Sequence, residues 1–326
     1  MVNNERIYKM PHILFIDTVH PLIKEELSEH GFTCDLFPDY IKEDLGNIID
    51  HYFGLIIRSR FKLDRAFLSK AGNLRFIGRV GAGMENIDVA YAENKGILCL
   101  NSPEGNRDAV GEHTVGMLLS LINHLNRADH QVRQGKWIRE GNRGMEIKGK
   151  TVGIIGYGNM GSAFAQRLKG FDAKVISYDK YKSGYSDGNT IESTLQEVFE
   201  LSDIVSIHVP LTEETNYMVN SWFLDRFRKQ VYLINTARGA IVNIRDLVTA
   251  MKSGKVAGAA LDVLEYEDDS FERLTENLPE EFKFLLEADN VILTPHIAGW
   301  TAESEYKLAK VLVDKIKLAF PYLDRP

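Results

Sequence analysis

Three ionisable residues in the second half of the chain each follow a short apolar run: Arg238, Glu267 and His296. If those runs are parallel strands, their carboxyl ends meet at one edge of a sheet, where ligands bind in such folds. A guanidinium can hold a carboxylate and polarise a keto group, and an imidazole can transfer a proton to or from an oxygen. A carboxylate such as that of Glu267 can orient His296 and favour its protonated form. We therefore expect these residues to interconvert a 2-keto acid and a 2-hydroxy acid, although each alone is also typical of a surface charge or a packed loop.

A glycine-rich segment precedes them and predicts a dinucleotide site. Gly156, Gly158 and Gly161 have the spacing GxGxxG, between an apolar run at 151–155 and a helical pattern at 162–169. The first glycine allows a tight turn, the second lets a pyrophosphate approach the backbone, and the third allows close helix–strand packing. The start of the helix then offers N–H groups and partial positive charge to the phosphates.

Asp179 ends the next expected strand, about 20 residues further along, at the place where such sites carry an acid. An acid there can hydrogen-bond ribose hydroxyls and would repel a 2′-phosphate, so the cofactor expected is NAD rather than NADP. The alternative is an ordinary glycine turn beside a solvent-facing Asp179.

A sheet must position these residues, and the apolar runs predict two series of strands. The runs of the first series lie at 13–16, 55–57, 74–77 and 97–100. Those of the second lie at 152–155, 174–178, 204–208, 231–235, 257–261 and 291–293. Continuous apolar strands separated by helical patterns indicate parallel sheets buried on both faces. The expected fold class is α/β, with two doubly wound parallel-sheet domains.

Two helical patterns set the expected domain boundaries. One long pattern covers 108–134 and is followed by a polar loop, and a last helix is expected at 302–320. This last helix follows the final strand of the second series, so we expect it to pack back on the first unit. The substrate domain is therefore predicted as 1–102 with 297–326, and the cofactor domain as 103–296.

Composition excludes several function classes. The 39 Lys and Arg residues against 46 Asp and Glu give a net charge of −7, and no basic run marks a surface for nucleic acid or for a membrane. No apolar stretch is long enough to span a bilayer, and the polar N-terminus does not resemble a signal peptide. Cys34 and Cys99 form no CxxC pair, so we expect two reduced, buried thiols and no metal site. The expectation is a cytoplasmic protein whose partner is a small molecule.

Taken together, the motifs resemble the D-isomer-specific 2-hydroxyacid dehydrogenase family over nearly the whole chain. Besides the glycine loop, the matching segments are 57–60, 80–83 with 86–88, 101–103 with Asn106, 205–210 with Thr215, 235–239, 260–263 and 294–299. The resemblance implies a Rossmann-type cofactor domain, a flavodoxin-like substrate domain and a cleft between them. It also implies NAD as the cofactor and a homodimer formed through the cofactor domain.

The resemblance also assigns roles to individual residues. It implies that Arg238, Glu267 and His296 are catalytic. The backbone expected to bind the substrate carboxylate is that of Val80, Gly81, Ala82 and Gly83. The expected cofactor contacts are Gly156, Gly158, Asn159, Met160, Gly161, Asp179, His208, Pro210, Thr215, Thr236, Ala237, Asp262 and Gly299.

Four features depart from the family pattern. Asn159 stands where an arginine is common, Glu104 where a glycine is usual, and Asp268 where a proline commonly follows the catalytic glutamate. In addition, a long acidic segment, 268–289, precedes His296. Either a solvated helical loop or a lid over the active site would fit this segment.

Arg58, Ser59 and Arg60 follow the run at 55–57 and indicate the substrate. In an extended stretch the two arginines point to one side and Ser59 points away. Because arginine binds phosphate oxygens in pairs, we expect 3-phosphohydroxypyruvate and 3-phosphoglycerate, the reactants of an enzyme of serine biosynthesis. Surface arginines that offset nearby acids are the alternative.

Two other functions remain open. The first is a glyoxylate or hydroxypyruvate reductase with the same catalytic residues. The second belongs to another class, an NAD-sensing binding protein of the corepressor kind, which the lack of extended tails disfavours. Formate dehydrogenase is disfavoured because its histidine partner is an amide, whereas this chain has Glu267.

Overall fold

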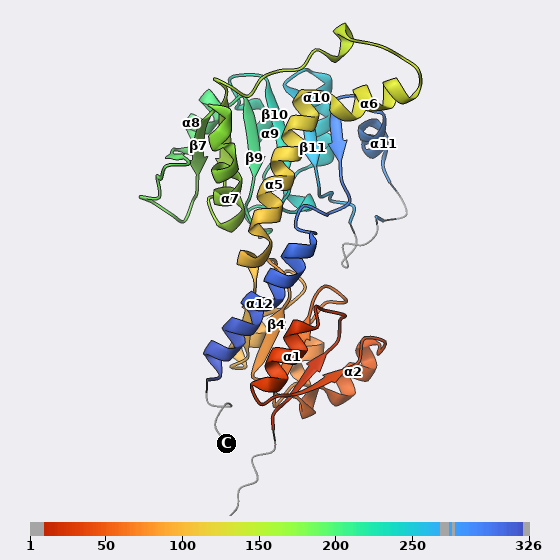
Figure 1. The fold of residues 1–326 in the computed structure, drawn as a ribbon, viewed down its shortest axis with the longest axis vertical. Coiled ribbons are helices and arrows are strands. Elements are labelled where there is room, and N and C mark those ends of the chain that lie inside the picture. Colours follow the sequence, from red (N-terminus) through yellow and green to blue (C-terminus); the bar gives the residue numbers. More distant parts are fainter. Residues whose placement is uncertain (1–9, 268–273, 276–277, 322–326) are drawn as a thin grey trace, which may run out of the picture. The chain divides into compact units, whose positions relative to one another are not determined.

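The computed structural model describes residues 10–267, 274–275 and 278–321 (Figure 1). The chain divides into two compact units, Met1–Asn106 with Thr301–Pro326, and Arg107–Trp300. These divisions fall after residues 106 and 300, where the sequence predicted 102 and 296. Several residues of the expected acidic insert lie outside the described residues, namely Asp268, Asp269, Glu272 and Glu276.

In the described part of the chain, the first unit is built on a five-stranded parallel sheet. Its strands are β1 (His12–Phe15), β2 (Thr33–Leu36), β3 (Gly54–Ile57), β4 (Phe76–Arg79) and β5 (Leu98–Asn101). Their order, β2-β1-β3-β4-β5, is the flavodoxin-like order that we expected. Neighbouring strands are all parallel, so their carboxyl ends lie on the same side of the sheet. The segments that follow β1, β3 and β4 therefore lie together at this carboxyl edge.

Alternating side chains of these strands enter two separate cores. Ile13 and Phe15 pack with α1 (Leu22–Glu29) and α12 (Ala302–Ala319) on one face. Leu14 and Ile16 belong to the core of the other face, with α2 (Lys42–Ile48), α3 (Arg65–Ser69) and α4 (Val89–Asn94). The helix α12 contacts α1, so the last helix of the chain belongs to the first unit.

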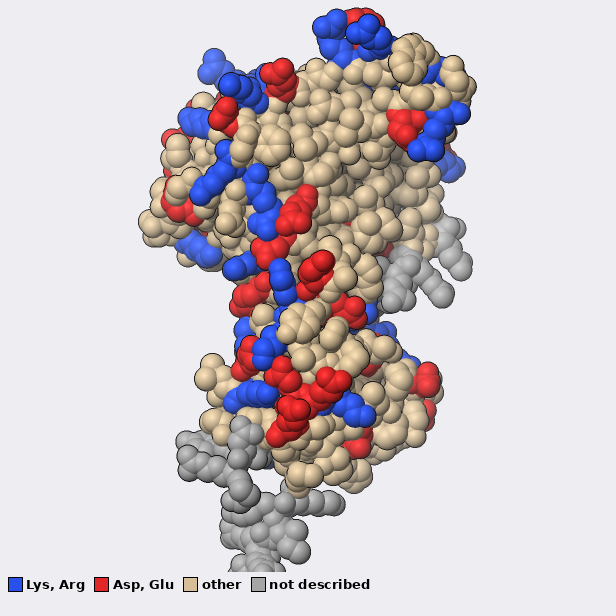
Figure 2. Space-filling view, in the orientation of Figure 1, with Lys and Arg blue, Asp and Glu red and all other residues tan. Residues whose placement is uncertain are grey.

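Charged side chains join these two helices at the surface. Lys310 and Lys317 of α12 both pair with Glu26 of α1, and Figure 2 shows acidic and basic side chains interspersed on this part of the first unit. The two lysines hold the pKa of the Glu26 carboxyl below its usual value. This half-buried network complements the apolar contact between the two helices.

The second unit is built on a seven-stranded parallel sheet within the described residues. Its strands are β6 (Thr151–Ile155), β7 (Lys174–Tyr178), β8 (Ile191–Glu192), β9 (Ile204–Ile207), β10 (Val231–Asn235), β11 (Val256–Leu261) and β12 (Val291–Leu293). Their order is β12-β11-β10-β9-β6-β7-β8. The chain thus starts in the middle at β6, runs outward to β8, and crosses back to β9 before running outward again. This reversal between β6 and β9 is the point where doubly wound sheets bind their ligands.

Helices cover both faces of this sheet. They are α5 (Pro103–Ile122), α6 (Leu125–Arg133), α7 (Asn159–Arg167), α8 (Leu195–Leu201), α9 (Ser221–Asp225), α10 (Ile244–Lys252) and α11 (Glu280–Glu287), and α5 begins in the first unit. Val152 and Ile154 of β6 join the core that contains residues of α5 and α7. Ile155 joins the opposite core, with residues of α8, α9, α10 and α11.

The single long helix predicted at 108–134 is wrong, because the structure divides it into α5 and α6. In a continuous helix the carbonyl of Ile122 would accept from residue 126. Here it accepts from the N–H of Met145 at 3.0 Å, and His124 adopts a left-handed φ of 55°. A contact with the following loop therefore ends α5.

Membrane-spanning helices and metal-ligand clusters are both absent from the described residues. No helix among them is long and apolar enough to cross a membrane, and no three His, Cys, Asp or Glu side chains among them gather to hold a metal ion. Cys34 and Cys99 are free thiols but only half-buried, whereas the sequence predicted that both are buried.

Candidate active site

Glu267 and His296 meet beyond the carboxyl ends of β11 and β12. Glu267 Oε2 lies 2.6 Å from His296 Nδ1, and the two side chains are only 13% and 25% exposed. The other carboxylate oxygen of Glu267 accepts from the N–H of Leu264 at 2.6 Å. The carboxylate is therefore fixed between the backbone and the imidazole, as the pairing predicted from sequence requires.

The loop that carries His296 is organised by Asp262, which follows β11 and is 1% exposed. Its carboxylate accepts from the Thr294 hydroxyl at 2.6 Å and from the N–H groups of Ile297 and Ala298 at 2.9 and 2.8 Å. The carbonyl of Asp262 accepts from the His296 N–H at 2.8 Å. These bonds hold His296 at a left-handed φ of 55°, which costs a non-glycine residue about 1–3 kcal/mol. The carboxylate expected to contact the cofactor thus also fixes the catalytic loop.

Arg238 follows β10, which is the neighbour of β11 in the sheet. Asn235 ends β10 and donates from Nδ2 to the Arg238 carbonyl at 2.9 Å. The guanidinium of Arg238 donates to the Ala237 carbonyl at 2.6 Å. A Cβ on the following Gly239 would lie 2.0 Å from the backbone of Leu264, so the segments after β10 and β11 are packed tightly together. The structure thus places the three expected catalytic residues after three successive strands, with Glu267 and His296 in contact.

The glycine loop has the shape that a dinucleotide needs. Gly156 has a left-handed φ of 92°, and a Cβ there would lie 2.5 Å from the His208 carbonyl oxygen. A Cβ on Gly161 would lie 2.0 Å from the Gly156 carbonyl oxygen, whereas one on Gly158 would meet nothing within 4 Å. The loop is therefore closely packed at Gly156 and Gly161, whereas the space beside Gly158 is open. The α7 helix begins at Asn159, and its preceding residue makes no side-chain cap, so the first N–H groups of the helix can receive phosphate oxygens.

Asp179 lies beside this loop. Its two carboxylate oxygens accept from the N–H of Tyr157 at 2.8 Å and from that of Tyr181 at 3.0 Å. Lys182 donates to the Tyr157 carbonyl at 2.9 Å. Asp179 is thus oriented by backbone groups on both sides, at the end of β7 and next to the loop between Gly156 and Gly158.

The remaining expected cofactor residues cluster after β9 and β10. Burial lowers the pKa of His208 to about 3, and its Nε2 lies 2.8 Å from the Ser206 hydroxyl. Its Nδ1 is buried without a hydrogen-bond partner among the described residues. Thr215 turns its hydroxyl to the Pro210 carbonyl at 2.6 Å, and Thr236 turns its own to Thr114 at 3.3 Å. These hydroxyls hold the segments that follow β9 and β10.

The predicted carboxylate-binding loop follows β4 in the first unit. Gly81 has a φ of 155°, and its N–H lies 3.2 Å from the Ser102 hydroxyl. The Ala82 carbonyl accepts from Asn101 Nδ2 at 2.6 Å. Among the described residues, the N–H groups of Ala82 and Gly83 meet no acceptor. This loop is fixed from β5 and offers two backbone donors.

The structure shows that the Arg58–Arg60 segment is a bend and not an extended stretch. Oδ2 of Asp17, which follows β1, accepts from the N–H groups of Arg58, Ser59 and Arg60 at 2.5, 3.2 and 3.4 Å. The chain bends around this carboxylate instead of running straight. In addition, the Arg60 guanidinium donates to the Ile16 carbonyl at 2.9 Å. The two arginines do not follow the alternation of a strand.

Sequence reasoning missed two residues of this edge. Asp17 follows an apolar run, as the catalytic residues do, and that position is the signal that could have found it. Arg79 ends β4, and its guanidinium lies against Gly81, where a Cβ would be 1.3 Å from Nη1. Arg79 stands directly before the loop 80–83 in the sequence, and that position could have identified it.

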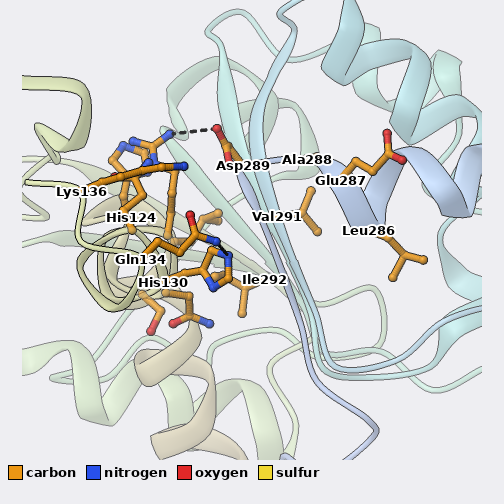
Figure 3. A pocket seen from close by; sticks show the side chains of 15 residues that line it. His124, His130, Gln134, Lys136, Leu286, Glu287, Ala288, Asp289, Val291 and Ile292 are labelled. Carbon is orange, nitrogen blue, oxygen red and sulfur yellow. Dashed lines mark hydrogen bonds and ion pairs between the residues drawn. The ribbon is translucent and has the colours of Figure 1, made fainter. Parts of the chain in front are cut away.

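One cavity of about 420 Å³ lies elsewhere on the second unit (Figure 3). It is lined by residues of α5, α6 and the segment from Leu286 to Ile292, and includes His124, His130 and Asp289. Because Val291 begins β12, this cavity is at the amino end of that strand, opposite the edge that carries His296. None of the expected site residues lines it.

Comparison with known proteins assigns the family. A sequence model of the D-isomer specific 2-hydroxyacid dehydrogenase NAD binding domain matches residues 115–298. Hydroxypyruvate reductase of Thermotoga maritima is 37% identical over 275 residues, which cover 84% of this chain and 87% of that protein. D-3-phosphoglycerate dehydrogenase of Archaeoglobus fulgidus is 34% identical over 306 residues, covering 90% of this chain but 56% of that protein. The chain therefore spans little more than half the length of this phosphoglycerate dehydrogenase.

A solved structure agrees with this similarity. D-lactate dehydrogenase of Aquifex aeolicus, complexed with NAD and lactic acid, matches with a TM-score of 0.80 and 29% identity. The match covers 96% of each chain. The α/β architecture described above is thus the architecture of known D-2-hydroxyacid dehydrogenases.

Proposed function

Because the chain belongs to the D-isomer specific 2-hydroxyacid dehydrogenase family, whose members are NAD-binding oxidoreductases, we propose that it interconverts 3-phosphoglycerate and 3-phosphohydroxypyruvate. In this proposal it is a cytoplasmic enzyme of serine biosynthesis. The proposal has three parts, which are the catalytic residues, the cofactor residues and the choice of a phosphorylated substrate.

The observation that carries the choice of substrate is the group of arginines at the carboxyl edge of the first sheet. Arg58 and Arg60 follow β3, Arg79 ends the neighbouring β4, and Asp17 is an acid close to the first two. Arginine recognises phosphate through paired hydrogen bonds. The unoccupied N–H groups of Ala82 and Gly83 suit the substrate's carboxylate. An acid with a phosphate at one end and a carboxylate at the other fits this edge.

The catalytic step assigns one task to each of the three residues. Glu267 holds Nδ1 of His296, so proton transfer to or from the C2 oxygen of the substrate falls to Nε2. The same contact fixes the orientation of the imidazole that donates this proton during reduction. Arg238 polarises the keto group and pairs with the substrate's carboxylate. The glycine loop and Asp179 would hold NAD, which would supply hydride chemistry at this site.

The residues of the second unit fit that cofactor. The open face of Gly158 and the start of α7 suit the pyrophosphate, and Asp179 suits the adenosine ribose. Burial depresses the pKa of His208, so its imidazole is neutral and adds no charge beside the glycine loop. Asn159, Met160, Ala237 and Gly299 are further contacts in this proposal.

A second candidate is reduction of an unphosphorylated acid, hydroxypyruvate or glyoxylate. The specific observation in its favour is that the Arg60 guanidinium already donates to the Ile16 carbonyl, which leaves it fewer donors for a phosphate. The identity of 37% to a hydroxypyruvate reductase points the same way. A corepressor-like binding protein differs from both, because it binds NAD without needing the contact between Glu267 and His296.

We also propose that two copies pair through the second unit. The helix α6 buries none of its side chains within the described structure, and Leu125 and Val132 on it are about half exposed. Trp137, shortly after it, is 80% exposed. Large apolar side chains that gather on one element suit an interface with a second copy of the chain.

The choice of substrate is tested with Arg58→Ala and Arg60→Ala. Each loss should lower kcat/KM for 3-phosphohydroxypyruvate by about 10- to 150-fold, the effect of one charge-assisted contact, and leave hydroxypyruvate nearly unchanged. Arg75→Ala is the matched control, because Arg75 precedes β4, at the amino ends of the strands, whereas Arg58 and Arg60 lie at the carboxyl ends. Equal losses with both substrates, or a better reaction with the unphosphorylated acid in the unmodified enzyme, would favour the second candidate.

A further inference from the structure

Two loops of the second unit meet across the strand that carries the glycine loop. In the sheet, β6 lies between β9 and β7, so the loops after β9 and β7 start about 10 Å apart, two strand spacings. Glu214 belongs to the first of these loops, and Lys180 and Tyr181 belong to the second. The glycine loop follows β6 and starts between them. Side chains that join these loops therefore cross the carboxyl end of β6.

Glu214 makes this crossing. One carboxylate oxygen pairs with the Lys180 ammonium, and the other accepts from the Tyr181 hydroxyl at 2.7 Å. Lys180 also lies 5.6 Å from the centre of the Tyr181 ring. The pair lowers the pKa of the Glu214 carboxyl and raises that of the Lys180 ammonium, so both are charged at neutral pH. The three side chains form a clasp, defined here as Lys180, Tyr181 and Glu214.

The clasp lies next to the acid of the cofactor site. Asp179 immediately precedes Lys180, and the Tyr181 N–H that donates to Asp179 belongs to the same residue whose hydroxyl is bound by Glu214. The Lys180 ammonium, next in sequence to this acid, is well placed to bind a 2′-phosphate when no other group pairs with it. In this structure the Glu214 carboxylate pairs with the Lys180 ammonium instead.

We propose that Glu214 is a specificity-determining residue for the cofactor, because it withholds Lys180 from a 2′-phosphate. This inference rests on the proposed placement of the adenosine ribose at Asp179. Two acids then act together against NADP. Asp179 repels the 2′-phosphate directly, and Glu214 neutralises the neighbouring cation that would otherwise attract it.

Lys182 is the other cation of this loop. Its ammonium donates to the Tyr157 carbonyl at 2.9 Å, and no acid partner of it is found among the described residues. Because Lys182 is present in every variant below, its attraction for a 2′-phosphate is a constant background. The contribution of Glu214 is therefore read as a difference between variants.

The test measures binding of ADP-ribose and of 2′-phospho-ADP-ribose by calorimetry, which needs no turnover. In an Asp179→Asn background, Glu214→Gln should improve binding of the phosphorylated probe relative to ADP-ribose by about five-fold, the effect of one exposed charge pair. With Asp179 intact the same change should shift that ratio by less than about two-fold, because the released Lys180 is then neutralised by Asp179. The effects of Asp179→Asn and Glu214→Gln on the binding ratio should therefore be non-additive.

Glu213→Gln is the matched control. Glu213 is an exposed acid next to Glu214 on the same loop, and no hydrogen bond or ion pair of its side chain is found in the described structure. If Glu214→Gln and Glu213→Gln change the ratio equally in the Asp179→Asn background, the inference is overturned. If the unmodified protein binds neither probe, the proposed cofactor site itself fails. Thermal unfolding of each variant confirms that it is folded.

Discussion

His296 is held both by its side chain and by its backbone. Glu267 binds its Nδ1, and the Asp262 carbonyl binds its N–H, in a loop that the Asp262 carboxylate fixes with three further bonds. A strained φ persists only where the surroundings determine it, and such positions cluster at functional sites. The left-handed φ of His296 agrees with that rule. Precise placement of the imidazole is what proton transfer requires.

At this scale the first prediction concerns the imidazole and its partner. His296→Asn should lower kcat by roughly 10²–10⁴, the usual contribution of a positioned acid or base. Glu267→Gln should also lower kcat, by a smaller factor, because the amide oxygen can still accept from Nδ1 but without the carboxylate's charge-assisted hydrogen bond. Steady-state rates measure both effects.

Two outcomes would contradict this assignment. Near-normal turnover by His296→Asn would remove the acid–base role and favour a binding protein. An unchanged kcat in Glu267→Gln, with chemistry rate-limiting, would show that the contact does not position the imidazole for proton transfer. His130→Asn serves as a control, since this exposed histidine of α6 is not part of the expected site.

His208 yields a prediction about stability. Burial lowers its pKa from 6.5 to about 3, so between these values the unfolded chain binds a proton that the folded protein does not. The free energy of unfolding therefore rises with pH through this window, and this contribution is complete above about pH 6.5 and lost as pH falls toward 3. His208→Gln should flatten this dependence by at least ~1 kcal/mol. Urea unfolding at several pH values, with His130→Gln as control, measures it, and equal slopes for all three proteins would refute the burial argument.

The positions of the expected catalytic and cofactor residues in the fold could be predicted from sequence because each follows an apolar run or a glycine motif. That rule located Arg238, Glu267, His296 and Asp179. It could not show what their side chains bind. The conformation of Arg58–Arg60 depends on Asp17, some forty residues away, which bends the segment and draws its N–H groups inward. No local pattern contains that contact.

At the scale of elements, continuous apolar runs located most of the strands but missed one edge strand of each sheet. The edge strand β2 has the sequence Thr-Cys-Asp-Leu and none of its residues is buried, so it has no apolar run. The other missed strand, β8, has only two residues. Both lie at an end of their sheet. Strands that bury only part of their surface need less apolar sequence, which is why the pattern does not show them.

Helix ends were also decided by distant contacts. The division between α5 and α6 depends on Met145, which binds the Ile122 carbonyl. At the other end of α5, Glu104 replaces the glycine usual in the family and pairs with Lys315 of α12 at 2.8 Å. Lys315 also donates to the Asn101 carbonyl at the end of β5. The contacts of Lys315 with Glu104 and Asn101 thus join α12, the start of α5 and the end of β5.

At the scale of the whole molecule, each unit carries its own set of chemical groups at the carboxyl ends of its strands. The first unit gathers arginines and free backbone N–H groups, which suit an anionic substrate. The second gathers the glycine loop, Asp179 and the pair of Glu267 and His296, which suit a dinucleotide and proton transfer. The sequence predicted this division of tasks because strand order in parallel α/β units brings loop residues together at one edge. In our proposal, the choice among acids of the same class depends on a few side chains in the first unit.

The most direct test of the account is the rate of NADH oxidation by the purified protein with a panel of 2-keto acids. The account predicts reduction to D-2-hydroxy acids, with the highest kcat/KM for 3-phosphohydroxypyruvate and lower values for hydroxypyruvate and glyoxylate. Binding of NADH without turnover of any acid on the panel would contradict the account.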